Sequence, residues 1–220
     1  NQVQFNRSGY TLAGGDLTLA GTGAGLFAKL GHSAVIGSQI LGTAGLTKTG
    51  GGMIRLTNPS NSYTGTTAIA NGSLIISHED ALGDDTSAVV VTGSATRGFG
   101  GGSLVLDATG GLLTFSRDLS LQGLGPIADR SAALITVGNT TLSGTVSTGV
   151  GAINTRLSSA NGLLTLAGTL DVAGTAGTTI SFLGGAANQT GAGHYRITGA
   201  ITGTGTIEKS GSGTLFLEPT

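Results

Sequence analysis

The chain has 220 residues, of which 42 are Gly and 33 are Thr, with only 3 Pro and neither Cys nor Trp. Its formal net charge is −1 and its ten basic residues are scattered singly, which argues against a nucleic-acid-binding surface. The absence of Cys excludes disulfides and thiolate metal sites. With 38% hydrophobic and 10% charged residues, the composition lacks the signature of disorder, so we expect a folded chain.

The start of the sequence does not resemble a leader peptide. Residues 1–7 lack the positive start and apolar core of a signal peptide. No later segment approaches the roughly 20 apolar residues of a membrane helix. We therefore expect a fragment of a longer chain that continues in both directions.

Short runs of alternating apolar residues predict β-strands along the whole chain. Each run places two apolar residues at positions i and i+2, which share the inward face of one strand. In chain order the pairs are Leu17/Leu19, Ile54/Leu56, Leu74/Ile76, Val89/Val91, Leu104/Leu106, Leu119/Leu121, Leu164/Leu166, Ile180/Phe182 and Leu215/Leu217. Gly-rich segments at 14–15, 50–52, 100–102, 110–111 and 184–185 predict tight corners between the strands.

The strand pattern favours a solenoid over other fold classes. No 11-residue window carries a helical stripe, which sets aside an α/β fold. A two-sheet sandwich remains a weaker alternative, because only Asn71-Gly72 and Asn161-Gly162 offer the preferred hairpin dipeptide. The class is therefore all-β.

Internal self-similarity supports the solenoid. A Lys-[Thr/Ser]-Gly-x-Gly core before an alternating apolar strand occurs at 48–52 and again at 209–213. Repeats that cannot bury an apolar face alone gain a continuous core by stacking. At roughly 20 residues per coil, we expect a single β-helical segment over 1–220 with about ten coils. Leu, Ile and Val would form interior ladders while Thr and Ser face solvent.

Residues 45–76 closely resemble the passenger-associated transport repeat of autotransporters. The family pattern runs G-L-x-K-x-G-x-G-x-L-x-L, then N-x-Y-x-G-x-T, then a strand, a Gly and another strand. The matching residues are Gly45, Leu46, Lys48, Gly50, Gly52, Leu56, Asn61, Tyr63, Gly65, Thr67 and Gly72. Residues 203–220 resemble the start of a second copy, with Lys209, Gly211 and Gly213. Met53-Ile54 departs from the usual Thr-Leu.

The resemblance implies a classical (type V) autotransporter passenger, which is a right-handed, single-stranded parallel β-helix. Such a passenger crosses the outer membrane through a C-terminal β-barrel of the same chain and folds on the surface of a Gram-negative cell. We expect a stalk and adhesin for cell adhesion, auto-aggregation or biofilm formation in virulence, with the repeat supporting secretion and folding. Expected partners are a host cell-surface or matrix component, or identical passengers. In a further reading, 1–220 only promotes the folding of a passenger whose activity lies elsewhere.

The one acidic concentration, His78-Glu79-Asp80 with Asp84 and Asp85, is the candidate site of an alternative function. Clustered carboxylates can hold Ca²⁺ or supply the acid and base for glycan cleavage, as in a carbohydrate-active β-helix (a polysaccharide lyase or hydrolase) or a glycan-binding one. The family usually has a polar corner here, and the chain is only 4% aromatic. We therefore interpret these residues as solvated corner residues and expect no enzymatic activity, no metal and no cofactor.

The remaining polar residues of interest have structural interpretations. His32, His78 and His194 lack any metal-ligand spacing and are expected on the surface. No phosphate-binding loop or nucleophile elbow is present.

Two residue types of the repeat receive specific predictions. We expect Lys48 and Lys209 to be edge residues that discourage lateral strand pairing, rather than ligands for polyanions. We expect the Tyr63 ring to pack on the coil edge while its hydroxyl stays in water.

Overall fold

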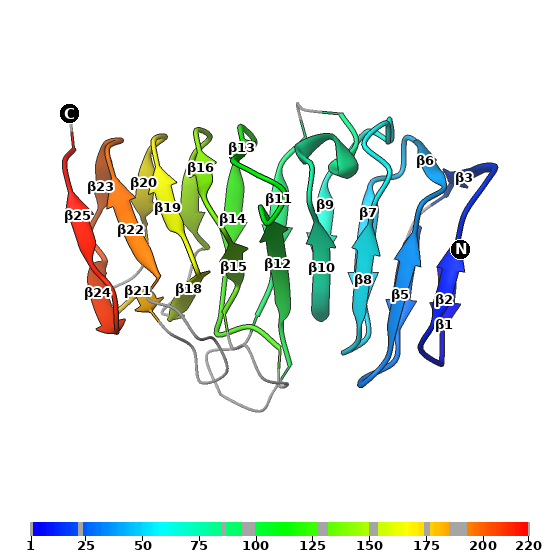
Figure 1. Cartoon of the computed structure of the whole chain (residues 1–220), viewed down its shortest axis with the longest axis horizontal. Helices are drawn as coiled ribbons and strands as arrows, with labels where there is room; N and C mark the ends of the chain where they lie inside the picture. The colour runs from blue at the N-terminus through cyan, green and yellow to red at the C-terminus, as the bar shows by residue number, and fades with distance from the viewer. Residues whose placement is uncertain are drawn as a thin grey trace.

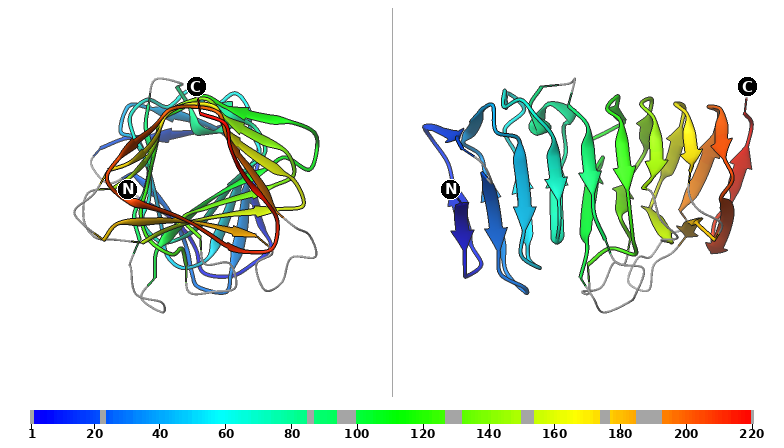
Figure 2. Two further views of the ribbon diagram at one scale, coloured as in Figure 1. Left: turned by 90° about the vertical axis from the view of Figure 1, so that its left-hand side faces the viewer. Right: turned by 180° about the vertical axis from the view of Figure 1, so that it is seen from behind.

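The computed structural model describes residues 2–21, 24–84, 87–93, 100–126, 132–149, 154–173, 177–184 and 193–219. Within these residues the strands stack as successive coils along one axis (Figure 1). Viewed along that axis, the coils superimpose around a common interior (Figure 2). Every strand-to-strand pairing among the named strands is parallel, which confirms the predicted parallel β-helix.

Two long sheets form two sides of the β-helix. The first sheet contains β1 (Gln2–Phe5), β4 (Gly25–Ala28), β7 (Leu46–Thr49), β9 (Thr67–Ile69), β11 (Val89–Val91), β14 (Leu119–Leu121), β17 (Val146–Thr148), β20 (Leu170–Val172) and β23 (Ile201–Gly203). The second contains β2 (Tyr10–Leu12), β5 (Ser33–Ile36), β8 (Met53–Leu56), β10 (Gly72–Ile76), β12 (Gly102–Asp107), β15 (Leu134–Val137), β18 (Thr155–Ala160), β21 (Thr179–Gly184) and β24 (Thr206–Gly211).

The third side is divided in the described structure. Its later part is a sheet of β13 (Leu113–Phe115), β16 (Thr140–Leu142), β19 (Leu163–Leu166), β22 (His194–Ile197) and β25 (Leu215–Leu217). Its early part is the pair β3 (Asp16–Leu19) and β6 (Gln39–Gly42). Between them lie an irregular segment after β8 and the 3₁₀ helix η1 (Glu79–Leu82). No helix among the described residues has the length and hydropathy needed to cross a bilayer.

The number of coils is smaller than the sequence suggested. Nine strands stack in each of the two long sheets, which corresponds to about eight turns rather than ten. The period expected from the sequence holds only locally. Ile54 pairs with Leu74 and Leu74 pairs with Leu104, so the second of these coils is half as long again as the first. Lengthened coils therefore reduce the number that fit in the chain.

Alternating side chains build the core as predicted. Ile54, Leu74, Leu104, Leu134 and Leu157 occupy one position of successive strands in the second sheet and are all fully buried. Burying each such side chain contributes about 1.5–3 kcal/mol. Seven of the nine predicted pairs are inward and buried. The exceptions lie in the first and last coils, where strands β3 and β25 each have a stacked neighbour on one side only.

The expectation that Thr and Ser face solvent was wrong for part of the chain. Thr67, Thr140, Thr155 and Ser159 are among the buried hydroxyl residues. The Thr155 Oγ1 donates to the carbonyl of Leu121, 3.1 Å away. Such bonds, made by the hydroxyls of Thr67, Thr155 and Ser159, offset the cost of removing these groups from water.

Candidate functional site

The residues of the 45–76 repeat meet at two corners of adjacent coils. Lys48 lies on β7, where alternation points it in the same direction as the buried Leu46. Its side chain is fully buried, and Nζ donates to the carbonyls of Thr49 (3.0 Å), Gly50 (2.8 Å) and Asn71 (2.9 Å). The first two carbonyls belong to the corner after β7, and the third belongs to the next coil.

The edge role predicted for Lys48 was therefore wrong. An inward ammonium group cannot discourage lateral pairing at a sheet edge, nor can it meet a polyanion in solvent. Burial lowers the pKa of Lys48 from its ordinary 10.5 to about 7, because the charged form is poorly solvated there. Lys48 instead joins one corner to the coil that follows.

The glycines around Lys48 are required by close backbone approach. Gly72 adopts φ +69°, and a Cβ there would lie 2.3 Å from the carbonyl oxygen of Gly52 and 2.4 Å from that of Gly50. It would also lie 2.8 Å from the Lys48 Nζ. Any side chain at Gly72 would push the two coils apart and displace the ammonium group.

Asn61 occupies the second corner, on the side of the β-helix where strands are interrupted. Its side chain is buried, with Oδ1 accepting from the Ile40 backbone N–H (2.7 Å) and Nδ2 donating to the Ala81 carbonyl (2.7 Å). Ile40 belongs to the preceding coil and Ala81 to the following one. One amide side chain thus links three coils where no regular strand continues the third side.

Tyr63 lies beside Asn61 and is also fully buried. Its hydroxyl shares a 2.7 Å hydrogen bond with the Thr67 Oγ1. Burial raises the pKa of Tyr63 to about 12. The prediction that its hydroxyl stays in water was therefore wrong, because the repeat's own Thr67 satisfies it inside the core. We call Lys48, Asn61 and Tyr63 the repeat clamp.

The coil after the repeat closes over Tyr63. Gly83 has φ +76°, and a Cβ there would lie 2.3 Å from the Tyr63 carbonyl oxygen. The buried Arg117 guanidinium donates to the carbonyls of Leu82, Gly83 and Asp84. Arg117 is not among the residues predicted from the sequence, although its spacing from the buried Phe115 is the alternation that marks an inward position.

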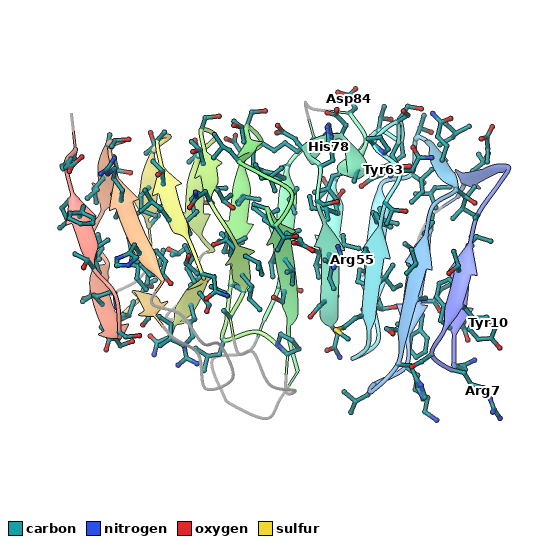
Figure 3. All side chains as sticks on the ribbon, viewed as in Figure 1. Arg7, Tyr10, Arg55, Tyr63, His78 and Asp84 are labelled. Atoms are coloured by element: carbon teal, nitrogen blue, oxygen red, sulfur yellow. The ribbon has the colours of Figure 1, made fainter. Side chains whose placement is uncertain are left out.

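The acidic concentration forms the 3₁₀ turn and its flanks rather than one converging site. His78 caps η1 through Nδ1, which accepts from the Asp80 N–H and lies 3.3 Å from the Asp80 Oδ2. Glu79 accepts hydrogen bonds from the Ser116 N–H and hydroxyl. Asp84 is exposed, and Figure 3 shows it and His78 at the same edge of the molecule. Asp85 lies outside the described residues.

No group of three acidic or histidine side chains in the described ranges is close enough to hold a metal ion. His194 is exposed, and His32 is half-buried with Nδ1 3.2 Å from the Ser8 hydroxyl. The described histidines and carboxylates therefore do not converge on a common substrate.

Lys209 repeats the cap made by Lys48. Its Nζ contacts the carbonyls of Ser210 (2.9 Å), Gly211 (3.1 Å) and Ser212 (2.8 Å) at the corner after β24. Partial burial lowers its pKa. Gly211 and Gly213 both adopt positive φ, at 71° and 88°. Lys209 is more exposed than Lys48, and its three acceptors all come from its own corner. Because Lys209 is half-buried on the last strand of the second sheet, the edge role predicted for it stays a prediction.

Comparison with known proteins gives a family for this arrangement. A family model described as the passenger-associated transport repeat matches residues 46–76, which contain the repeat clamp. The chain is similar to the adhesin BmaC autotransporter of Brucella suis biovar 1 (strain 1330), with 35% identity over 94% of the chain. The chain spans about 6% of the length of that relative. No solved structure matches this chain significantly.

The stacked parallel coils, the matched repeat and the similarity along nearly the whole chain lead to one assignment. In the described structure Lys48, Asn61 and Tyr63 of the repeat make hydrogen bonds within and between its coils. Together these findings fit an autotransporter passenger that carries a passenger-associated transport repeat.

Proposed function

We propose that this chain is a non-enzymatic, adhesive part of a passenger displayed on the surface of a Gram-negative cell. The observation that carries the proposal is the combination of a continuous β-helix with polar rows on its outside. Thr114, Thr141 and Thr165 occupy one outward position of successive strands in the third sheet. Single hydroxyl contacts are weak, but repeated in register they give avidity. Its similarity to a protein named as an adhesin supports the same role.

The partner in this proposal is a host cell-surface or matrix component, or a second passenger. Auto-aggregation and biofilm formation follow if passengers bind one another through such rows. A C-terminal barrel of the same protein would hold the passenger at the outer membrane.

Adhesion of displayed protein tests the proposal. Residues 1–220 would be displayed on non-adherent bacteria, with an unrelated β-helix of similar length as the control. We expect more cells to attach to cultured epithelium, or to settle by aggregation, than in the control. Thr141→Asp with Thr165→Asp should reduce the effect while the fold persists. Equal attachment of control and test cells would contradict the adhesive role.

We further propose that residues 45–76 are the unit that stabilises the growing stack during folding outside the cell, and that 203–220 begin a second such unit. Contacts between neighbouring coils let folding spread in one direction as the chain emerges. The repeat clamp supports this role because it bonds its own coil to the coil before it and to the coil after it. Deleting 45–76 should make the displayed passenger protease-sensitive, and unchanged resistance would contradict it.

A further inference from the structure

An abrupt change in coil length alters the outward face of the second sheet. Ala34 pairs with Ile54, whereas Leu74 pairs with Leu104, so the chain that joins the second pair is half as long again. Leu104 pairs with Leu134, so the coil after that is equally long, and it includes the exposed turn 109–112 after β12. In solenoids, insertions in single repeats form loops on one face, which is often the binding face.

This turn forms one wall of a cleft of about 450 Å³, within the size range of small-ligand sites. The cleft is lined by Arg55, Ser77, Asp107, Thr109, Leu112 and neighbouring residues. Arg55, labelled in Figure 3, lies on β8. It reaches across β10 to Asp107 on β12, with Nη1 2.9 Å from Oδ2. The cleft therefore spans three adjacent coils.

The polar groups of the cleft retain hydrogen-bonding capacity. Asp107 accepts one bond from Arg55 and two from Thr109, whereas a carboxylate can accept about four. Burial acts to raise the pKa of Asp107, but the bonds from Thr109 and Arg55 outweigh it and hold the pKa below its usual value. The guanidinium group of Arg55 carries five N–H donors, and its bond to Asp107 uses one of them. The two opposite charges leave the cleft neutral.

A second cleft of about 430 Å³ adjoins it on the same face. Its apolar lining includes Met53, Ile75 and Val105. These residues precede Arg55, Ser77 and Asp107 by two positions along β8, β10 and β12, with Ser77 directly after the end of β10, so both sets lie on the outward face. A ligand that lies along the strands meets an apolar surface and then a polar one.

We propose that this double cleft binds a neutral glycan that carries N-acetyl groups, an inference that rests on the proposed adhesive function and gives it a ligand class. Neighbouring sugar hydroxyls both donate and accept, which suits the adjacent guanidinium and carboxylate. The acetamido methyl groups fit the apolar cleft, and Leu112, 69% exposed, offers an aliphatic wall to a sugar ring. The neutral pair gives polyanions no electrostatic advantage.

Calorimetric titration of the 220-residue chain with chitotetraose tests the proposal, with cellotetraose as the matched probe without N-acetyl groups. Saturable binding of chitotetraose is expected, at least about tenfold tighter than that of cellotetraose. Arg55→Met should weaken it at least about tenfold. Arg196→Met is the matched control, since Arg196 pairs with Glu218 on another sheet (3.6 Å), and it should bind as the wild type does.

Circular dichroism establishes that each variant is folded. If Arg55→Met does not fold, Ser77→Glu at an exposed position of the same cleft should abolish binding instead. Absence of saturable binding, equal binding of the folded cleft variants, or preference for a heparin tetrasaccharide or an extended peptide would overturn the glycan site.

If displayed cells adhere although the chain binds no chitotetraose, the glycan site fails and the adhesive function stands. If displayed cells do not adhere, the adhesive function fails.

Discussion

At the residue scale, the repeat clamp replaces backbone pairing where the coils turn. Asn61 completes bonds to the coils before and after it, and Lys48 supplies a donor to three corner carbonyls. Leaving a buried donor or acceptor unpaired costs about 1–3 kcal/mol. A polar side chain in this interior is therefore stabilising only as long as all of its partners stay in place.

Asn61→Ala should lower the free energy of unfolding by about 2–4 kcal/mol, because it leaves the Ile40 N–H and the Ala81 carbonyl without a partner. Chemical denaturation checks the value. Asn6→Ala, at an exposed position, is the control and should change stability by less than about 0.5 kcal/mol. If Asn61→Ala lost no more stability than Asn6→Ala, the role of the Asn61 amide in linking the coils would be contradicted.

Lys48 makes stability depend on pH in a definite direction. The pKa is about 7 in the folded state and 10.5 when the side chain is solvated, so the unfolded chain binds more protons between these values. The contribution of Lys48 to stability should therefore rise as the pH increases from 7 to 10.5. Denaturation of wild type and Lys48→Met across this range should show a difference that grows in favour of wild type. A difference independent of pH would contradict the assignment.

At the element scale, η1 depends on a side chain from a later coil. The Arg117 guanidinium holds the carbonyls that end this short helix. Arg117→Met should speed amide hydrogen exchange in 79–84, because four residues of 3₁₀ helix have little stability of their own. Mass spectrometry of exchanged peptides measures this, and Arg196→Met again serves as the control. Unchanged protection of 79–84 would mean that η1 is held by other contacts.

Strands could be predicted from sequence better than the clamp could. Alternation is a local property, so pairs such as Leu74/Ile76 identify a strand and its inward face directly. The same alternation places Lys48 on the inward face, two residues after Leu46. Its residue type instead predicts an edge position, and here the position in the strand decides. The carbonyls that make its burial tolerable come partly from Asn71 in the next coil. Sequence alone does not reveal which backbone groups meet there.

At the scale of the whole molecule, the stack is a one-dimensional array in which each coil contacts its neighbours. The number of turns could not be predicted, because it depends on insertions such as the one between Val89 and its partner Leu119, which lengthens that coil. The outer coils have a neighbour on one side only, as the exposure of Leu217 shows. Local opening should therefore start at the ends of the described stack, and we expect the bonds of the repeat clamp to resist its spread.

Native-state hydrogen exchange along the 220-residue chain tests the central claim that the repeat clamp holds the stack together. We predict that the amides of β7 to β10 (46–76) exchange only through global unfolding, while those of β1–β3 and β23–β25 exchange through smaller openings. In Lys48→Met with Asn61→Ala, protection of 46–76 should fall to the level of the end coils. The account would be contradicted if 46–76 exchanged as fast as the ends in the wild type, or if the double variant left its protection unchanged.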